Sequence, residues 1–234
     1  MYFDWTYIVL LLPALIFSMW ASSRVNSSYS KYSKQFSRRG ISAAQAARSV
    51  LNANGLRDIA IEHISGNLTD HYDPSAKVIR LSDGVYSNTS AAAIGIACHE
   101  VGHAIQHAQG YAPLKLRNSI VPITNFGAKL STPLILLGLM LSSLSYSYIS
   151  ISYLGIICFA LCTFFQLITL PVEFNASRRA MESIQAQGLL YDDELQSTKK
   201  VLSAAALTYV AALAVSMMQL LRFLLIVGGN RRRD

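Results

Sequence analysis

The stretch Leu130–Val172, LSTPLILLGLMLSSLSYSYISISYLGIICFALCTFFQLITLPV, contains no Asp, Glu, Lys or Arg in 43 consecutive residues. A helix needs about 20 apolar residues to cross a bilayer, so this run is long enough to cross twice. The Ser- and Tyr-rich part Ser142–Ser152 is the expected turn between the two crossings. The sequence therefore predicts a transmembrane hairpin over residues 118–172.

The composition of the whole chain also indicates a membrane protein. Of the 234 residues, 52% are apolar and only 14% are charged, and the mean hydropathy is +0.34. These values exceed what a soluble domain of this length needs. Two further apolar segments are Met1–Trp20 and Val201–Leu221, and the second extends past Arg222 toward Val227. We expect a mainly α membrane protein with three to four transmembrane helices. The last segment, residues 201–228, either crosses fully or packs against the others.

The first apolar segment is expected to be an uncleaved anchor over residues 1–23. A cleaved signal peptide is the alternative, but the segment carries Asp4 in place of basic residues at its start. No small-residue cleavage site follows Ser18–Ser22. Basic residues follow the anchor directly and none precedes it; they are Arg24, Lys31, Lys34, Arg38 and Arg39. By the positive-inside rule, residues 24–117 should be cytoplasmic. One feature disagrees, because the basic tail 229–234 would lie outside if the last helix crosses.

The net charge of +7 does not indicate a nucleic-acid-binding protein. The basic residues are scattered at the borders of apolar segments, without the aromatic residues that read bases. Anionic lipid headgroups are the expected partners of these charges. The three cysteines form no metal-binding pattern, since Cys158 and Cys162 lie within an apolar helix and Cys98 stands alone.

A second informative stretch, His99-Glu100-Val101-Gly102-His103, has the pattern H-E-x-x-H. On an α-helix its two imidazoles lie on one face, one turn apart, where they can hold zinc. Glu100 is rotated by about 100° from His99, so it can act as a general base on water. The polar residues Ser87–Ser90 offer helix caps and Gly110 a stop, which predicts a helix over Ala91–Ala108. This pattern is typical of metal-assisted hydrolysis, usually of a peptide bond.

The motif supplies only two ligands, whereas catalytic zinc normally has three from the protein. His107 lies about 12 Å along the helix from His99, too far for both to bind one ion. Glu173 is the better candidate, since it follows the uncharged run and a membrane hairpin would return it to the side of His99. Pro171 suggests that a helix starts there. The alternatives are two ordinary exposed histidines and a plain membrane-border glutamate.

The segment before the motif reads as a small soluble α+β part. Ser42 can cap a helix over Ala43–Ala53, which Asn54 and Gly55 end. Residues 59–64 and 78–81 show the alternation of short strands. We expect these two strands to form a hairpin, followed by the helix of the motif. Residues 78–81 should be an edge strand on which an extended peptide can bind.

Several segments together resemble a known family, the YugP-type neutral zinc metallopeptidases of bacterial membranes. This family is related to the CAAX prenyl proteases and to heat-shock membrane proteases. The resemblance covers nearly the whole chain and rests on Phe3–Trp5, Leu68–Pro74, His99–His107 and Pro171–Arg179. It implies a bacterial cell-membrane zinc endopeptidase with a gluzincin-like catalytic part, made of a β-hairpin, the motif helix and a third-ligand helix. The substrate would be a protein or peptide.

The resemblance also implies roles for single residues. His99, His103 and Glu173 would bind one Zn²⁺ per chain, and Glu100 would be the catalytic base. Ser177 stands where the related group has an aspartate. A serine can hydrogen-bond a ligand histidine but cannot supply the charge of the carboxylate, so either zinc binds more weakly or another acid such as Asp70 or Asp73 substitutes. The residue that stabilises the oxyanion is not assigned, and the candidates are His71, Tyr72, Asn175 and Arg178. His107 is expected to lie next to the metal ligands or to contact the substrate.

Two other functions remain as alternatives at this stage. One is an intramembrane zinc protease of the site-2 type, although the polar residues Gln106, His107 and Gln109 make the motif helix a poor membrane span. The other is a membrane scaffold or adaptor without catalytic activity. The expected organisation begins with an anchor (residues 1–23), a cytoplasmic catalytic part (24–117) and a membrane hairpin (118–172). A third-ligand helix with linker (173–200), a last apolar helix (201–228) and a basic tail (229–234) follow.

Overall fold

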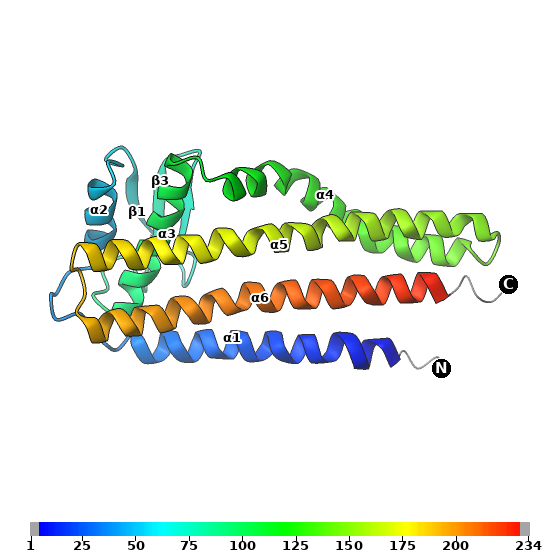
Figure 1. Cartoon of the computed structure of the whole chain (residues 1–234), viewed down its shortest axis with the longest axis horizontal. Coiled ribbons are helices and arrows are strands. Elements are labelled where there is room, and N and C mark those ends of the chain that lie inside the picture. Colours follow the sequence, from blue (N-terminus) through cyan, green and yellow to red (C-terminus); the bar gives the residue numbers. More distant parts are fainter. Residues whose placement is uncertain (1–4, 230–234) are drawn as a thin grey trace. The chain divides into compact units, whose positions relative to one another are not determined.

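The computed structural model describes residues 5–229, and these divide into two compact units. The first, here called the helical unit, combines Met1–Ala21, Leu116–Leu170 and Thr208–Asp234. The second, the mixed unit, combines Ser22–Lys115 and Pro171–Leu207. Four long helices, α1, α4, α5 and α6, contribute residues to both units (Figure 1). The predicted basic tail and the Phe3–Asp4 part of the family resemblance lie outside the described residues.

Within residues 5–229, four helical segments are long and apolar enough to cross a membrane. The first joins a π-helical turn, Tyr7–Leu11, to α1, Leu12–Tyr32. The others are α4 (Ala112–Leu141), α5 (Ile149–Ala186) and α6 (Asp192–Gly229). A turn and the short 3₁₀ helix η2, Tyr146–Tyr148, connect α4 to α5 within the stretch Ser142–Ser152 that was predicted as the turn, and residues 149–152 already belong to α5. The prediction of a mainly α membrane protein is therefore confirmed, with four candidate spans.

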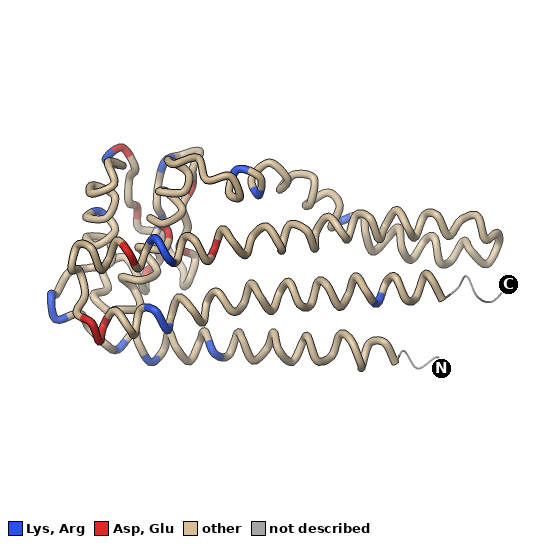
Figure 2. Tube along the Cα trace, in the orientation of Figure 1, with Lys and Arg blue, Asp and Glu red and all other residues tan. Residues whose placement is uncertain are grey.

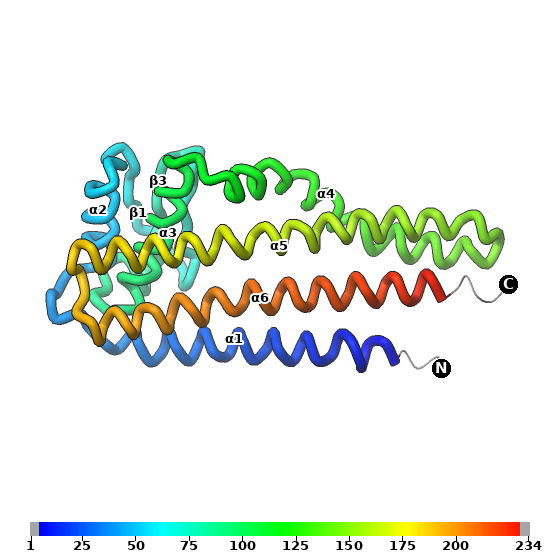
Figure 3. The backbone as a smooth tube through the Cα atoms, viewed as in Figure 1, coloured from blue at the N-terminus to red at the C-terminus, as the bar shows by residue number. Residues whose placement is uncertain are grey.

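Small residues hold α4 and α5 together inside the helical unit. Gly138 contacts the backbone of Ser152 so closely that a Cβ atom could not fit there. The Ser152 hydroxyl also donates a hydrogen bond of 2.8 Å to the carbonyl of Ile135. Close approach at glycine and hydroxyl bonds across helices are the usual way in which membrane helices associate. Figure 3 shows α4 as a bent tube, as expected for a helix with Pro122 and Pro133 in its interior.

Charged residues are rare in the helical unit. Among its described residues only Arg117, Lys129 and Arg222 are charged, whereas both signs are frequent in the mixed unit (Figure 2). Large apolar side chains of the helical unit are exposed; Phe126 and Met140 on α4 are 66% and 73% exposed. An apolar outer surface with so few charges fits a surrounding of lipid.

The mixed unit is built on a small sheet covered by helices. Helix α2 spans Ala43–Ala53 and begins with the predicted Ser42 cap, completed as a capping box by Gln45. The sheet has strands β1 (Ala60–Ile64), β2 (His71–Asp73) and β3 (Val78–Ser82), in the order β1-β3-β2. Helix α3 spans Ala91–Ala108 and packs on α2 and the sheet around a buried apolar core.

The predicted pairing of the strands is wrong. Strand β1 pairs with β3 in parallel, and the hairpin is formed by β2 with β3 in antiparallel register. Strand β3 is therefore central and not the predicted edge. Its residues Val78, Ile79, Leu81 and Ser82 are all buried, on both faces of the strand. As the central strand, β3 has a hydrogen-bonded neighbour along each edge, and the second neighbour is β2, which is too short to recognise from alternation.

Two predicted helix boundaries are also wrong. Helix α5 runs through Pro171 without a break, so the third-ligand helix is the continuation of the membrane helix. It continues because Val172, Ala176, Ala180 and Ile184 repeat every four residues and are all fully buried. Proline is tolerated inside membrane helices because neighbouring groups satisfy the backbone.

Helix α6 starts at Asp192, well before the predicted start at residue 201. Acidic residues occupy its first turn, where the helix dipole favours negative charge. The buried carboxylate of Glu194 accepts a hydrogen bond of 2.9 Å from the backbone N–H of Tyr191, as in a capping box. These local signals define the start of the helix more sharply than its apolar stretch does.

Candidate metal centre

Helix α3 places His99 and His103 on one face. The side chain of Ser90 accepts a hydrogen bond from the Ala93 N–H and starts the helix, as the sequence predicts. The two imidazole rings meet edge to face with their centroids 4.8 Å apart. Their Nε2 atoms both point toward the same carboxylate, that of Glu173 on α5.

Glu173 completes a group of three metal-binding side chains. Its Oε2 atom lies 3.3 Å from His99 Nε2 and 3.5 Å from His103 Nε2. The three donor atoms lie within 4.8 Å of one another, and Glu173 is 2% exposed. Two imidazole nitrogens and one carboxylate oxygen are a donor set that suits zinc and leaves a position for water. The residues present therefore fit a catalytic zinc ion.

A glycine lets the two ligand-bearing helices approach closely. Gly102 lies between the two histidines in sequence, and a Cβ atom at this position would collide with the backbone carbonyl of Ala176 on α5. The backbone of a continuous helix cannot move aside as a flexible side chain can. Gly102 is therefore needed for α3 and α5 to meet at the distance that the three side chains require.

Replacing Gly102 by Ala should lower the melting temperature of the protein in detergent. The added methyl group has to push α3 and α5 apart, and overpacking of this kind typically costs about 1–3 kcal/mol. Gly228→Ala is the matched control, because nothing lies within 4 Å of a Cβ atom added there. Equal melting temperatures for both variants would refute the close contact.

Glu100 faces the side of α3 next to the histidines and is 9% exposed. Its Oε2 atom accepts a hydrogen bond of 3.0 Å from the backbone N–H of Tyr72 on strand β2. Burial raises the pKa of the Glu100 carboxyl above its usual value, and this effect outweighs the lowering by the neighbouring His99 and His103. A carboxylate with a raised pKa, held in place by one backbone donor, is suited to take up and release a proton.

Each histidine is oriented through its second ring nitrogen by a neutral side chain. His99 Nδ1 lies 3.1 Å from the Ser177 hydroxyl, and His103 Nδ1 lies 3.0 Å from Gln106 Oε1. Ser177 thus makes the contact that the sequence assigned to its position. The proposed substitutes Asp70 and Asp73 do not: Asp70 accepts hydrogen bonds from Ser82, and Asp73 pairs with Arg80.

Gln106 is a residue whose contact with a metal-binding histidine was not predicted from the sequence. It is completely buried, and its Nε2 atom donates to the carbonyl of Val172 at 2.8 Å and to Asn175 Oδ1 at 2.9 Å. Asn175 in turn accepts a hydrogen bond of 2.6 Å from Arg179. Gln106 was identifiable from its spacing, because a residue three positions after His103 lies on the same face of the helix.

The variant Gln106→Ala should bind zinc about 10–100-fold more weakly than the wild type, because His103 loses the group that fixes its orientation. Competition with a chromogenic zinc chelator measures this affinity. Thr198→Ala is the control, since it removes a buried hydrogen bond to Ala91 that does not reach the histidines. If both variants keep wild-type affinity, Gln106 does not orient the ligand.

Several other predicted site residues are not among the three metal donors. Tyr72 and His107 contact each other, with 2.9 Å between the hydroxyl and Nδ1, and His107 is not part of the group of metal donors. His71 is exposed and its Nδ1 atom lies 2.8 Å from the carbonyl of Thr69. Arg178 is also exposed and lies 4.0 Å from Glu182. Cys98 is buried, and burial raises the pKa of its thiol to about 12, which excludes a reactive thiolate.

Comparison with known proteins finds relatives over nearly the full chain. Residues 7–228 match the model of a family described as "Putative neutral zinc metallopeptidase". The chain is 49% identical over 225 residues to the Bacillus subtilis (strain 168) protein named "Putative membrane protease YugP", which covers 96% of this chain and 98% of that protein. No solved structure shows a significant match. The matched segment includes α3 and all three side chains of the candidate metal centre.

Proposed function

Because the chain belongs to this family of neutral zinc metallopeptidases, we propose that it is a membrane endopeptidase in which His99, His103 and Glu173 hold one zinc ion. The observation that carries this proposal is the convergence of three metal donors from two separate helices, beside a buried glutamate. A scaffold or adaptor protein has no need for such a group. Bound zinc would polarise a peptide carbonyl and lower the pKa of water.

In the proposed reaction Glu100 moves the proton. Its carboxylate takes a proton from the attacking water and delivers it to the nitrogen of the leaving amine, so that the residue is unchanged after one cycle. The backbone N–H of Tyr72 holds the carboxylate in position, and the contacts of Ser177 and Gln106 keep both imidazoles oriented. The Tyr72 hydroxyl and His107 are the candidates for contact with the substrate carbonyl oxygen, because they contact each other and the backbone N–H of Tyr72 contacts Glu100.

The substrate strand would lie along β2. This strand is an edge of the sheet, and its residue Tyr72 contacts Glu100 through the backbone. Helix α3 packs against β2, so an extended peptide that follows this edge passes close to the metal centre. Strand β2 thus takes the role for which residues 78–81 were the candidates.

A peptidase acting outside the bilayer is favoured over an intramembrane protease of the site-2 type. Helix α3 is not one of the four candidate spans found within residues 5–229, and it belongs to the mixed unit with its many charges. The detergent-purified full chain should therefore cleave casein, a soluble unfolded protein, and lose this activity on treatment with a zinc chelator. Activity should return on addition of zinc. Cleavage restricted to membrane-spanning substrates would support the intramembrane alternative.

The metal centre is proposed to face the cytoplasm of a bacterial cell. Supporting this, the basic residues that follow the anchor belong to the mixed unit, which also contains the candidate metal centre. A cysteine introduced at the exposed position Ser75 would react with a membrane-impermeant maleimide only in opened cells. Labelling in intact cells would place the mixed unit outside.

A further inference from the structure

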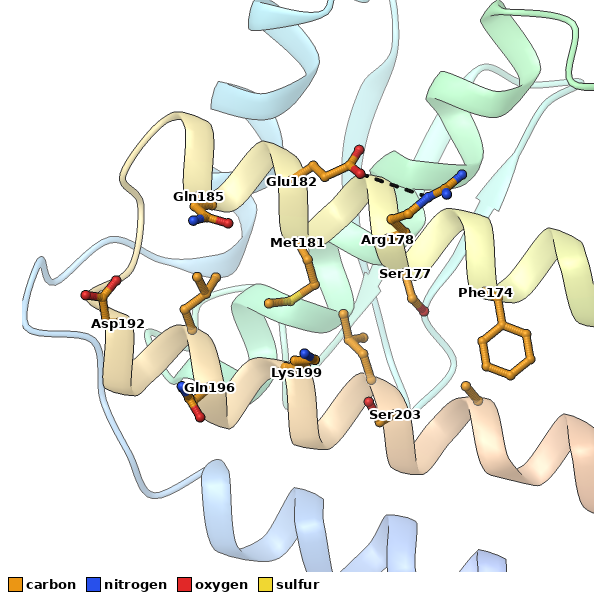
Figure 4. A pocket seen from close by; sticks show the side chains of 13 residues that line it. Phe174, Ser177, Arg178, Met181, Glu182, Gln185, Asp192, Gln196, Lys199 and Ser203 are labelled. Atoms are coloured by element: carbon orange, nitrogen blue, oxygen red, sulfur yellow. Dashed lines mark ion pairs between the residues drawn. The ribbon is translucent and has the colours of Figure 1, made fainter.

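The mixed unit contains a pocket of about 730 Å³ between the C-terminal part of α5 and the N-terminal part of α6 (Figure 4). This volume lies in the range of typical ligand-binding sites. Side chains from both helices line it, among them Phe174, Ser177, Met181, Lys199, Leu202 and Ser203. We refer to it as the α5–α6 pocket. Nothing in the proposed proton transfer uses it.

This pocket is next to the candidate metal centre. Ser177 forms part of its wall, and the same hydroxyl lies 3.1 Å from His99 Nδ1. Phe174, at one end of the pocket, directly follows the metal donor Glu173 in the helix. A single side chain therefore separates the pocket from a metal-binding histidine. The Nε2 atom of the same histidine faces Glu173, so one imidazole ring lies between the pocket wall and the other metal donors.

The side chains of the pocket fit a polypeptide. Apolar groups such as Phe174 and Leu202 can receive an apolar side chain, and the amides of Gln185 and Gln196 offer both donors and acceptors for a peptide backbone. Charges of both signs also line it, including Lys199. A lipid acyl chain would leave these polar groups without water or partners, which is costly. A nucleotide is also a poor fit, because its phosphates need cationic side chains and would be repelled by the acidic residues Glu182 and Asp192 of the pocket.

The charged groups of the pocket are available to a ligand. Lys199 and Asp192 form no ion pair with any other residue of the described range 5–229. The pair Arg178–Glu182 has a separation of 4.0 Å with both side chains about two-thirds exposed, so it is weak in water. A bound peptide with charged side chains could therefore compete for these groups.

We propose that the α5–α6 pocket binds the segment of a polypeptide substrate that flanks the cleaved bond. This inference rests on the proposed peptidase function and adds a determinant of specificity to it. An apolar residue of the substrate would contact Phe174 and Leu202, and the substrate backbone would bind Gln185 and Gln196. Substrates with an apolar residue in the flanking segment should be preferred.

The test is to fill the pocket and measure peptide binding without cleavage. Ser203 is exposed on the pocket wall, so Ser203→Trp can fill the pocket without disturbing the core. In the full-length, zinc-loaded Glu100→Gln protein, this change should weaken binding of a fluorescein-labelled casein peptide about tenfold or more. Ala186→Trp, at an exposed position of α5 outside the pocket, should leave the binding unchanged. Gln196→Trp is a second filling variant if Ser203→Trp does not fold.

The outcomes separate this inference from the proposed function. If the wild type binds zinc and cleaves casein while both filling variants bind the peptide as tightly as Ala186→Trp does, the pocket proposal is overturned and the peptidase function stands. If the wild type binds no zinc and cleaves nothing, the proposed function fails, and the pocket proposal fails with it. Weaker binding in the filling variants alone, with zinc content and melting temperature unchanged, supports the pocket.

Discussion

Replacing Glu100 by Gln is expected to lower the rate of casein cleavage by about 10²-fold or more, with the bound zinc retained. The amide has nearly the same shape as the carboxylate and can still accept the hydrogen bond from the Tyr72 N–H. It cannot take up a proton at neutral pH. The steady-state rate of cleavage, measured with protein of known zinc content, tests this expectation.

A matched change at another buried acidic residue controls for effects on stability. Glu194 is 1% exposed and accepts hydrogen bonds from the backbone of Arg38 and Tyr191, away from the metal donors. Glu194→Gln should lower the melting temperature. The specific activity per folded molecule should stay close to that of the wild type. Wild-type activity in the Glu100→Gln variant would exclude Glu100 as the base, because no substitute can supply its proton transfer from the same position.

Replacing Glu173 by Ala is expected to weaken zinc binding by more than the 10–100-fold that loss of an orienting group causes. The change leaves two imidazoles as the only protein donors, where a catalytic zinc site normally has three. Activity should disappear with the metal. Equilibrium dialysis against buffered free zinc measures the affinity directly, with the melting temperature of the metal-free protein recorded in parallel.

His107→Ala serves as the comparison for Glu173→Ala. His107 contacts Tyr72 but does not belong to the group of metal donors, so this variant should bind zinc as the wild type does. If His107→Ala loses zinc and Glu173→Ala keeps it, the third ligand has been assigned to the wrong residue.

The sequence predicts those parts of the structure that local physical chemistry determines. The uncharged run defines the membrane hairpin, because every crossing needs a minimum number of apolar residues. Ser42 and Ser90 cap their helices in the expected way, since an N-cap acts on the backbone of its own first turn. The candidate donors His99, His103 and Glu173 were also identifiable, because motif spacing and a returning hairpin together restrict the third ligand to few positions.

Features that depend on distant parts of the chain were not predictable in this way. Strand β3 pairs with β1 along one edge and with β2 along the other, and alternation in a segment of five residues does not reveal which strands lie there. Pro171 indicated a helix start, but packing of the following residues against α3 keeps α5 continuous. The contact of Gln106 with His103 could be predicted from their spacing on one helix. The hydrogen bond of Gln106 to Val172 could not, because it joins two helices that are distant in the sequence.

The most direct test of the metal centre is zinc K-edge X-ray absorption on the detergent-purified wild-type chain with its metal content determined. The proposed centre predicts one zinc per chain with only nitrogen and oxygen neighbours, including the scattering pattern of two imidazoles. A folded protein that takes up no zinc, or a zinc ion with a sulfur neighbour, would contradict a centre built from His99, His103 and Glu173.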